Sequence, residues 1–224
     1  MPVFPFTFSF ENTFCISLDS RPDRWENMQK RFDLFDMNVQ RWVASTPSNV
    51  TDCFVNYLNG GQRGCSQSHV NIYRHIIENN IKYALILEDD ACFDILWKCK
   101  LKQFTDMLSE EQFENLNMVM LNASEPMDNL FNWELQREQY LTGGYIITQK
   151  GAKWILNYFQ NCFFSADWMT TRLQLYDGNT YSYFPWLIIQ EGKDSTIGEQ
   201  CQADHDKVVR CLENIEYSIA NHYV

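Results

Sequence analysis

The sequence predicts an α/β protein in which helices flank a central mixed, mostly parallel sheet. Three observations support this fold class. Short apolar runs alternate with amphipathic stretches, which is the pattern of βα units. The 224 residues are 45% hydrophobic and 15% aromatic, which suffices for a core and excludes a disordered chain. No repeat or linker divides the chain, so we expect a single domain over residues 1–224.

The clearest βα unit lies near the amino terminus. Residues 13–18, four of them apolar, predict a strand. Ser20 is a good helix N-cap and Pro22 suits a first helical turn, so we expect a helix to begin here. Apolar residues at spacings of three and four should place one face of this helix against the sheet. The residues on that face are Trp25, Met28, Phe32 and Phe35.

The next predicted elements lead to the most buried strand. They are a strand over residues 37–44, a loop over residues 60–64, and a helix capped by Ser66 or Ser68. Residues 83–87 then form a continuous apolar run that is too short for a helix. Such a run is typical of a strand covered on both faces.

The second half of the chain adds further strands. Residues 117–121 and 145–148 predict two of them, the latter followed by a helix. Residues 184–189 predict an edge strand, and residues 207–219 a terminal helix. The sheet should therefore contain at least five strands.

The charge balance excludes several classes of partner. The chain has 18 Lys and Arg against 29 Asp and Glu, a formal net charge of −11. It lacks the basic clusters on which nucleic-acid and anionic-membrane binding depend. No apolar run approaches the roughly 20 residues that span a bilayer, so we expect no transmembrane segment. The eight cysteines include no CxxC pair and the chain starts without a basic leader, so we expect a reducing, cytoplasmic location.

Three consecutive acids, Glu88, Asp89 and Asp90, follow the buried strand directly. In open α/β sheets, ligands bind beyond the carboxyl ends of strands. Carboxylates this close repel one another, and a hard divalent cation relieves that repulsion. A solvated turn in which Asp90 caps the next helix explains the same residues, so position alone leaves both interpretations open.

Two basic or polar groups could contact an anionic ligand. Arg21 and Arg24 lie beside a predicted helix N-terminus, where backbone N–H groups and the helix dipole favour anions. Exposed surface arginines are the alternative. The small residues at 64–68 could admit a ligand closely at the next helix start. His69 follows them, although a lone His in a first turn is commonly a structural partner.

Two later residues are weaker candidates. Asp167 precedes Trp168, an aromatic residue that could stack on a sugar while the acid takes a hydroxyl proton. Ser165 capping a helix, with Asp167 in its first turn, explains them without function. His205 could complete a metal site, but no ligand spacing supports it. The sequence lacks GxSxG, Walker A, HExxH and GxGxxG motifs, which removes the commonest hydrolase, P-loop, zincin and dinucleotide-binding interpretations.

Taken together, these segments resemble glycosyltransferase family 25, which includes bacterial lipopolysaccharide sugar transferases and procollagen galactosyltransferases. The resemblance covers roughly residues 13–197. It rests on an ordered set of stretches: ISLDSRPDR at 16–24, GCSQSH at 64–69, ALILEDD at 84–90, GGYII at 143–147, ADWM at 166–169, Pro185, Gln190 and STI at 195–197. Ser17 replaces an expected Asn, and Gln62 stands where an acidic residue is common.

The resemblance implies a GT-A-like fold and inverting transfer of a hexose, galactose ahead of glucose, from a UDP-sugar to a glycan or hydroxylysine-type hydroxyl. It also implies a cation, Mn²⁺ or Mg²⁺, which would supply the positive charge that an acidic chain lacks. The metal ligands would be Asp89, Asp90 and His205. The catalytic base would be Asp167, with Glu88 second. The donor would contact Arg21, Arg24, Ala44, Ser68 and His69.

Two other functions stay open. One is a non-catalytic glycosyltransferase-like module that binds a glycan or a partner enzyme, although such a module has no reason to keep an acidic cluster. UDP-sugar hydrolysis with Mn²⁺ would distinguish it. The other is a metal-dependent phosphohydrolase, which lacks a second spaced carboxylate or histidine motif. Phosphatase activity exceeding sugar transfer would favour it.

Overall fold

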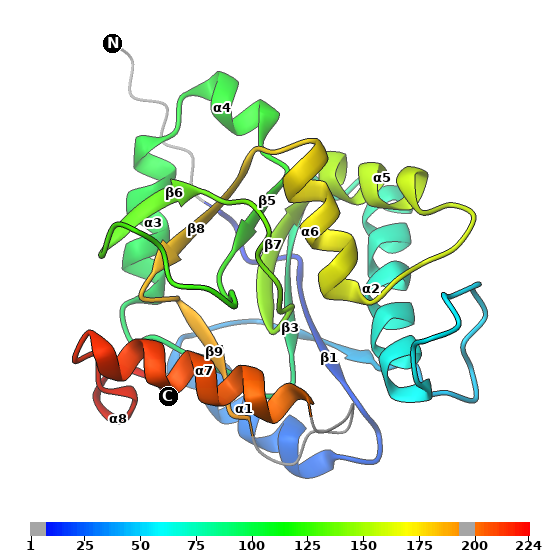
Figure 1. Ribbon diagram of the computed structural model, residues 1–224, viewed down its shortest axis with the longest axis horizontal. Coiled ribbons are helices and arrows are strands. Elements are labelled where there is room, and N and C mark those ends of the chain that lie inside the picture. Colours follow the sequence, from blue (N-terminus) through cyan, green and yellow to red (C-terminus); the bar gives the residue numbers. More distant parts are fainter. Residues whose placement is uncertain (1–7, 193–199) are drawn as a thin grey trace.

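The computed structural model describes residues 8–192 and 200–224, and the side chains of residues 200–204 are not described. Figure 1 shows the arrangement of the elements. The strands are β1 (Thr13–Ser17), β2 (Gln40–Val43), β3 (Tyr83–Glu88), β4 (Ala91–Phe93), β5 (Met118–Met120), β6 (Asn132–Leu135), β7 (Gly144–Thr148), β8 (Thr180–Phe184) and β9 (Ile188–Gln190). The helices are α1 (Pro22–Leu34), α2 (Gly60–Glu78), α3 (Trp97–Met107), α4 (Glu110–Asn115), α5 (Gln149–Tyr158), α6 (Ala166–Tyr176), α7 (Gln200–Asn214) and α8 (Ile219–His222).

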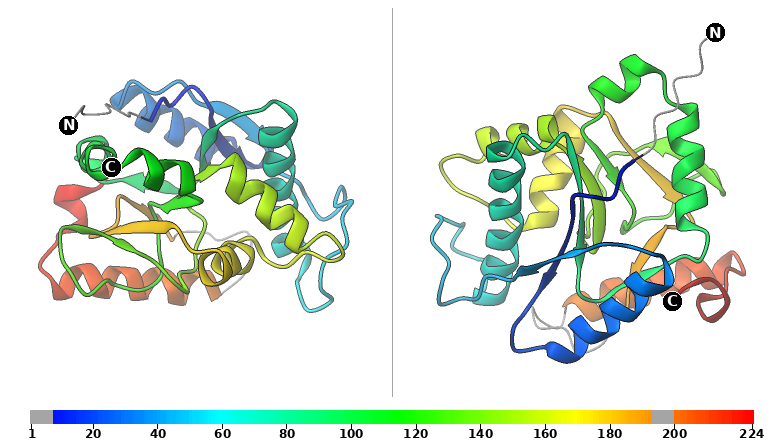
Figure 2. Two further views of the ribbon diagram at one scale, coloured as in Figure 1. Left: turned by 90° about the horizontal axis from the view of Figure 1, so that it is seen from above. Right: turned by 180° about the vertical axis from the view of Figure 1, so that it is seen from behind.

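The main sheet has seven strands in the order β2-β1-β3-β7-β5-β8-β6, and β4 pairs with β9 in a small second sheet. The pairs β1–β2, β1–β3 and β5–β8 are parallel, whereas β7 and β6 run antiparallel to their neighbours. Most strands therefore share one direction, and Figure 2 shows helices on both faces of the sheet. The predicted fold class, an α/β fold with a mixed sheet flanked by helices, is confirmed.

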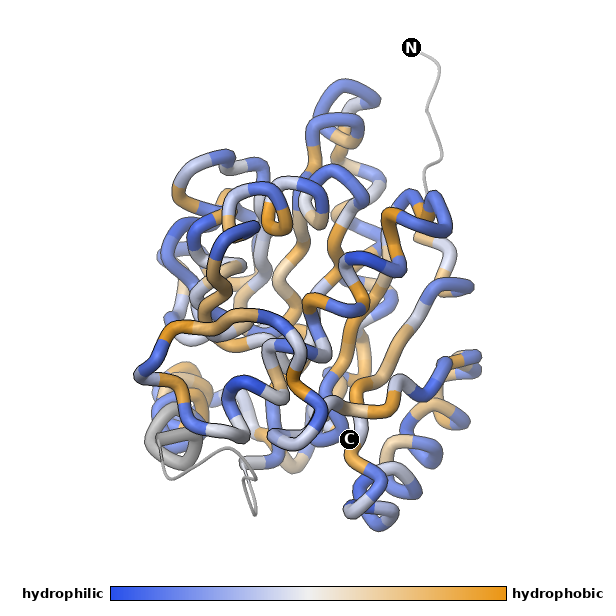
Figure 3. The backbone as a smooth tube through the Cα atoms, turned by 90° about the vertical axis from the view of Figure 1, so that its right-hand side faces the viewer, coloured by the Kyte–Doolittle hydropathy of each residue, from blue (hydrophilic) through white to orange (hydrophobic). Residues whose placement is uncertain are grey.

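The side chains of β3 alternate between two hydrophobic cores, one on each face of the sheet. Ala84 and Ile86 point to the face covered by α2, α5 and α6, where they join a cluster with residues of those helices. Leu85 and Leu87 point to the opposite face, against α1 and α3. Both faces of the strand are buried, which explains its continuous apolar run. Figure 3 shows that hydrophobic residues follow the central strands and that hydrophilic residues lie mostly on the outside.

A third cluster covers the small sheet with the carboxyl-terminal helices. Trp186 and Ile189 pack against Val208 and Leu212 of α7. Lys100 joins α3 to this region through a buried ion pair with Asp94 at 2.7 Å and a hydrogen bond to Tyr217 Oη at 2.9 Å. In Figure 1, α1 and α7 lie at the end of the sheet where β3 finishes. No helix among the residues described is long and apolar enough to cross a membrane.

The first helix is confirmed with Pro22 in its first turn, but its N-cap is not Ser20, and the predicted start of the second helix was wrong. Helix α1 begins at Pro22 with Arg21 as N-cap, because Arg21 N–H first closes a turn onto the Leu18 carbonyl at 3.1 Å. Ser20 is therefore a turn residue. Helix α2 begins at Gly60 rather than at Ser66 or Ser68, because Asn59 and Gln62 form a reciprocal capping box. The cap favours a helix start here although each glycine has a low helix propensity, about 1 kcal/mol less favourable than alanine.

Two later boundaries also differ from prediction. Residues 184–189 do not form one strand, because β8 ends at Phe184 and β9 begins at Ile188 in the other sheet. The terminal helix starts earlier than predicted and ends at Asn214, followed by the short α8. Residues 195–197 of the family resemblance lie outside the described residues. The predicted strands at 13–18, 37–44, 83–87, 117–121 and 145–148 are confirmed with small shifts at their ends.

Candidate functional site

The site is centred on the acidic residues at the carboxyl end of β3. Because strand side chains alternate, Glu88 lies on the α2 face with Ala84 and Ile86, and Asp89 lies on the α1 face. No helix follows Asp90, because β4 begins at once with Ala91. The helix-cap explanation of Asp90 was therefore wrong.

Glu88 accepts hydrogen bonds from two separate segments and lies beside His69 of a third. Thr142 Oγ1 donates to Glu88 Oε1 at 2.7 Å, and Gln190 Nε2 donates to Oε2 at 3.3 Å. His69 Nε2 lies 3.4 Å from Oε1 but without hydrogen-bond geometry. Burial raises the pKa of Glu88, but His69, Thr142 and Arg24 outweigh burial and hold this pKa below its usual value. Glu88 is therefore ionised at neutral pH.

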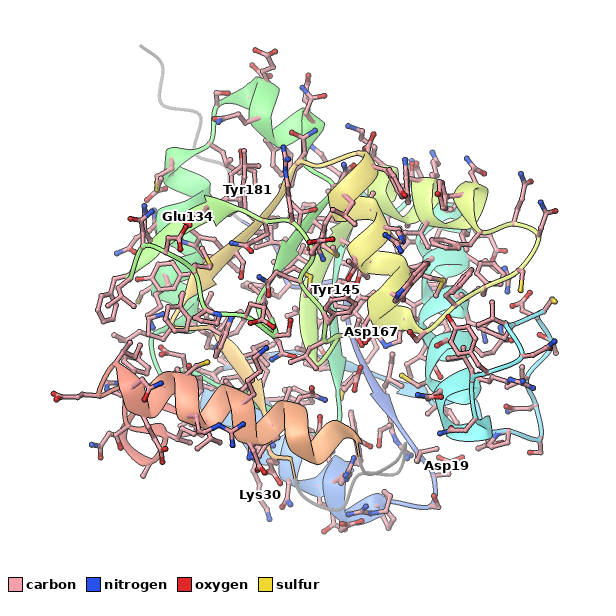
Figure 4. The ribbon with its side chains drawn as sticks, viewed as in Figure 1. Asp19, Lys30, Glu134, Tyr145, Asp167 and Tyr181 are labelled. Atoms are coloured by element: carbon pink, nitrogen blue, oxygen red, sulfur yellow. The ribbon has the colours of Figure 1, made fainter. Side chains whose placement is uncertain are left out.

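Behind Glu88, a buried polar chain runs into the core. His69 Nδ1 shares a 2.7 Å hydrogen bond with Tyr145 Oη, and Tyr145 Oη shares another of 2.7 Å with Tyr73 Oη. All three side chains are buried, and Figure 4 shows Tyr145 in the middle of the molecule. Burial raises the pKa of both tyrosines, so they remain neutral. This chain orients the His69 ring with Nε2 toward Glu88.

Asp89 has a cationic partner. Arg24 Nη1 of α1 donates to Asp89 Oδ1 at 3.0 Å, and both side chains are nearly buried, at 12% and 9% exposure. Arg21, the N-cap residue, instead pairs with Asp23 in the first turn of α1 at 2.8 Å and is more exposed. The two arginines that the sequence grouped together therefore face different surroundings, and Arg24 is the one at the acidic residues.

Asp90 lies in the turn between β3 and β4. Its Oδ1 accepts a hydrogen bond of 3.3 Å from the neutral amide of Gln190. Burial, followed by the negative charge of Glu88, raises the pKa of Asp90 to about 7. A cation beside this carboxylate would relieve both effects. The oxygen donors of Asp89 and Asp90 thus fit the hard divalent metal that the sequence predicts.

Two glycines at the start of β7 let β9 approach the acidic residues. A Cβ on Gly143 would lie 2.6 Å from Gln190 Cγ, and a Cβ on Gly144 would lie 2.5 Å from Ile188 Cδ1. This close packing places the Gln190 amide between Glu88 and Asp90. In the sequence, these glycines stand out only as part of the family resemblance. The Gly-Gly pair before a strand was the signal that another backbone or side chain approaches there.

Ala44 and Ser68 have structural roles in the observed contacts. Ser68 is fully buried, and its Oγ donates to the Gly64 carbonyl at 2.9 Å and accepts from Ser45 N–H at 2.8 Å. Ala44 is buried in the α2-side core. Because α2 begins at Gly60, residues 64–69 lie beyond its first turn. The predicted position of these residues at a helix start was therefore wrong, and their contact with a donor stays a prediction.

Asp167 lies in the first turn of α6, and Figure 4 shows it at the end of that helix nearest the carboxyl end of β3. Its Oδ1 accepts from Trp168 N–H at 2.8 Å. The Trp168 ring stacks with Phe164 at 4.5 Å, and the Arg172 guanidinium lies 3.8 Å from the ring centroid. Neighbours thus cover the ring, which leaves Trp168 without the free face that sugar stacking requires.

His205 lies against Gly192, where an added Cβ would clash with the imidazole ring. Its Nδ1 is buried without a hydrogen-bond partner within residues 8–192 and 200–224. Among the described residues, the group that could ligate a metal is instead Cys65, His69 and Glu88, with donor atoms within 4.8 Å of one another. The predicted joint site of His205 with Asp89 and Asp90 has no support in this arrangement.

Sequence reasoning did not single out three residues around Glu88 and His69, namely Cys65, Thr142 and Tyr145.

Comparison with known proteins gives one family. The model of glycosyltransferase family 25, described as an LPS biosynthesis protein, matches residues 10–170. Procollagen galactosyltransferase 1-B of Xenopus laevis is 28% identical over 179 residues, covering 68% of this chain and 29% of that protein. Procollagen galactosyltransferase 2 of Homo sapiens is 24% identical over 179 residues, covering 68% and 28%.

A glycosyltransferase 25 family member of Anopheles gambiae is 24% identical over 173 residues, covering 66% of this chain and 29% of that protein. The chain therefore spans less than a third of the length of these relatives. Among solved structures, a glycosyltransferase involved in the glycosylation of the major capsid of PBCV-1 is similar at a TM-score of 0.40 and 11% identity. The match covers 74% of this chain and 75% of that one.

Proposed function

Because this chain belongs to glycosyltransferase family 25, we propose that it transfers a hexose, galactose ahead of glucose, from a UDP-sugar to a hydroxyl group with inversion. The relatives named procollagen galactosyltransferase support galactose. The observation that carries the proposal is the set of three acids at the carboxyl end of β3, where each acid has different partners.

Asp89 and Asp90 would hold a divalent metal, Mn²⁺ or Mg²⁺. When bound, this cation supplies Lewis-acid stabilisation for a leaving diphosphate. Arg24 remains beside it through its ion pair with Asp89 and adds a fixed positive charge. The cation and Arg24 would thus supply positive charge where negative charge develops on the diphosphate.

The two candidate bases differ in how many of their oxygens are engaged. Both carboxylate oxygens of Glu88 accept hydrogen bonds, one from Thr142 and one from Gln190. In Asp167, Oδ1 accepts the Trp168 N–H, which leaves Oδ2 to accept a proton. We therefore assign the base to Asp167 and a positioning role to Glu88. The acceptor oxygen loses its proton to Asp167 and bonds to the anomeric carbon as the bond to the diphosphate breaks and UDP leaves.

Thermal unfolding with UDP tests the donor site. At a UDP concentration about 100 times Kd, binding stabilises the folded state by about 2.7 kcal/mol, which raises Tm by roughly 5–10 °C. We expect this rise when UDP and Mn²⁺ are both present and not with UDP and EDTA. Equal protection by UDP in EDTA would contradict the metal-dependent donor site.

A matched pair of variants locates that site. Asp90→Asn should abolish the joint effect of UDP and Mn²⁺. Asp106→Asn, which changes an exposed acid paired with Lys102 on α3, should keep it. Hydrolysis of UDP-galactose and UDP-glucose by the same proteins then ranks the two sugars. UDP binding without hydrolysis or transfer for any donor would favour the non-catalytic module.

A further inference from the structure

A thiol, an imidazole and a carboxylate that could bind a metal lie close together between α2 and β3. Cys65 and His69 are four residues apart in α2, so they project from one helix face. Glu88 faces them from β3, and one donor atom of each residue lies within 4.8 Å of the others. His69 is completely buried, yet its Nε2 has no hydrogen-bond partner among the described residues. Its contact with Glu88 Oε1 at 3.4 Å lacks hydrogen-bond geometry. A buried imidazole nitrogen without a hydrogen bond is costly, so a cation held between the two atoms would be favourable.

The spacing of the donors suits a tetrahedral ion. Ligands about 2.0–2.3 Å from zinc lie about 3.3–3.7 Å from one another. His69 Nε2 and Glu88 Oε1 already lie 3.4 Å apart. The Cys65 thiol therefore has to approach by little more than about 1 Å to complete three ligands. Cys65 and Glu88 are only partly buried, which leaves a route for the ion and a position for water.

The residues around these donors resemble the outer shell of a metal site. Metal-bound histidines commonly hydrogen-bond through their other ring nitrogen, which fixes the ring orientation. His69 does so through Nδ1 to Tyr145, which is bonded in turn to Tyr73. Glu88 is oriented by Thr142 Oγ1 on the oxygen that faces His69. Both ligands are thus held in place without an ion.

We propose that Cys65, His69 and Glu88 form a binding site for a thiophilic divalent cation such as Zn²⁺. On binding, the Cys65 thiol releases its proton to solvent and the thiolate sulfur coordinates the ion, so two anionic ligands balance its charge. The donor set differs from the oxygen ligands of Asp89 and Asp90. A thiolate and an imidazole favour Zn²⁺ or Co²⁺, whereas carboxylates favour Mg²⁺ and Mn²⁺. The proposal does not rest on sugar transfer.

Cobalt spectroscopy tests this site. The protein is reduced, stripped of metal and carries Cys53→Ser with Cys162→Ser, because those two thiols lie 3.9 Å apart and could bind metal themselves. Titration with Co²⁺ should give a thiolate-to-cobalt charge-transfer band that saturates at one equivalent. One equivalent of Zn²⁺ should remove the band, and Mn²⁺ at the same concentration should not.

Variants assign the band to these ligands. Cys65→Ser should abolish it, while Cys99→Ser, at an exposed thiol of α3, should leave it unchanged. Tyr145→Phe, which removes the partner of His69 Nδ1, should weaken Zn²⁺ binding about tenfold. A band that persists in Cys65→Ser, or no band in the parent protein, would overturn the proposal.

X-ray absorption on the zinc-loaded parent protein gives a second readout that needs no substitution at the ligands. We expect one sulfur scatterer at about 2.3 Å together with imidazole scattering. A shell of oxygen and nitrogen alone would overturn the site even if the variants do not fold. Neither readout involves a nucleotide sugar, so failure of the proposed transferase function leaves this result unaffected.

Discussion

Glu88 and Asp89 are neighbours in the chain but lie in different electrostatic surroundings. Glu88 lies on the α2 face, where a hydroxyl group, an amide and an imidazole surround it. Asp89 lies on the α1 face, where the Arg24 guanidinium binds it. One residue of shift along the chain therefore changes the hydrogen-bond donors from a hydroxyl group and an amide to a guanidinium group.

Consecutive acids at the end of a strand can therefore have different roles. The side-chain period of two sends each acid to the helix layer on its own side. In the turn, the Asp90 carboxylate accepts a hydrogen bond only from the Gln190 amide in the described part of the chain. We therefore assign positioning to Glu88, charge pairing to Asp89, and the strongest need for a cation to Asp90.

The largest effect should follow Asp90→Asn. Loss of a metal ligand removes several kcal/mol of transition-state stabilisation, so the transfer rate should fall at least about 100-fold. The free energy of unfolding without metal should not fall, because Asn keeps the shape of the side chain and removes a repelling charge. Initial rates with UDP-galactose and urea unfolding measure the two quantities. A fully active Asp90→Asn protein would refute the metal role of this residue.

Arg24→Gln should have the next largest effect, this time on stability. It leaves the nearly buried Asp89 carboxylate without its cation, which should cost about 3 kcal/mol. Asp89→Asn in the same protein should restore much of that loss. Urea unfolding of both single variants and the double variant gives the coupling energy. Simple additivity of the two costs would show that the pair contributes nothing specific.

The polar chain behind Glu88 gives a smaller, graded effect. Tyr145→Phe leaves His69 Nδ1 and Tyr73 Oη without their shared partner, so it should cost about 2 kcal/mol. Tyr73→Phe keeps the bond between Tyr145 and His69 and should cost about 1 kcal/mol. Chemical unfolding of the two variants tests this order. Equal costs would mean that Tyr145 does not link the two groups.

The smallest effect is expected at Asp52, a control carboxylate that pairs with Arg74 farther along α2. Arg74 hydrogen-bonds both Asp52 oxygens and, despite partial burial, holds the pKa of Asp52 below its usual value. Arg74 is 37% exposed, so Asp52→Asn should cost less than about 1 kcal/mol at neutral pH.

The pH dependence at Asp52 has a defined sign. Because the folded pKa lies below the unfolded value of about 3.9, the stabilisation is complete above that value. It is lost as pH falls through the folded pKa. The difference in Tm between wild type and Asp52→Asn should therefore shrink toward zero in acid. A difference that grows in acid would show that the pair does not lower this pKa.

Local patterns predicted the strands well because each depends on a short segment. Residues 83–88 are apolar up to the point where the acids begin, and that pattern needs no distant partner to be interpreted. The start of α2 could not be found from its glycines. Asn59 and Gln62 cap the helix there, and Gly64 is required because a Cβ would lie 2.6 Å from the Ser45 carbonyl oxygen. Only the folded chain brings Ser45 to that position.

The sequence by itself determined the fold class and the place of the three acids after β3, since hydropathy patterns and strand ends are local properties. The tertiary structure alone decided the partners of those acids. Thr142, Gln190 and Arg24 come from segments between 54 and 102 residues away, and no spacing in the chain relates them to β3. Hydrogen bonds and desolvation act through space, so the chemical state of each carboxylate depends on which layers of the fold meet around it.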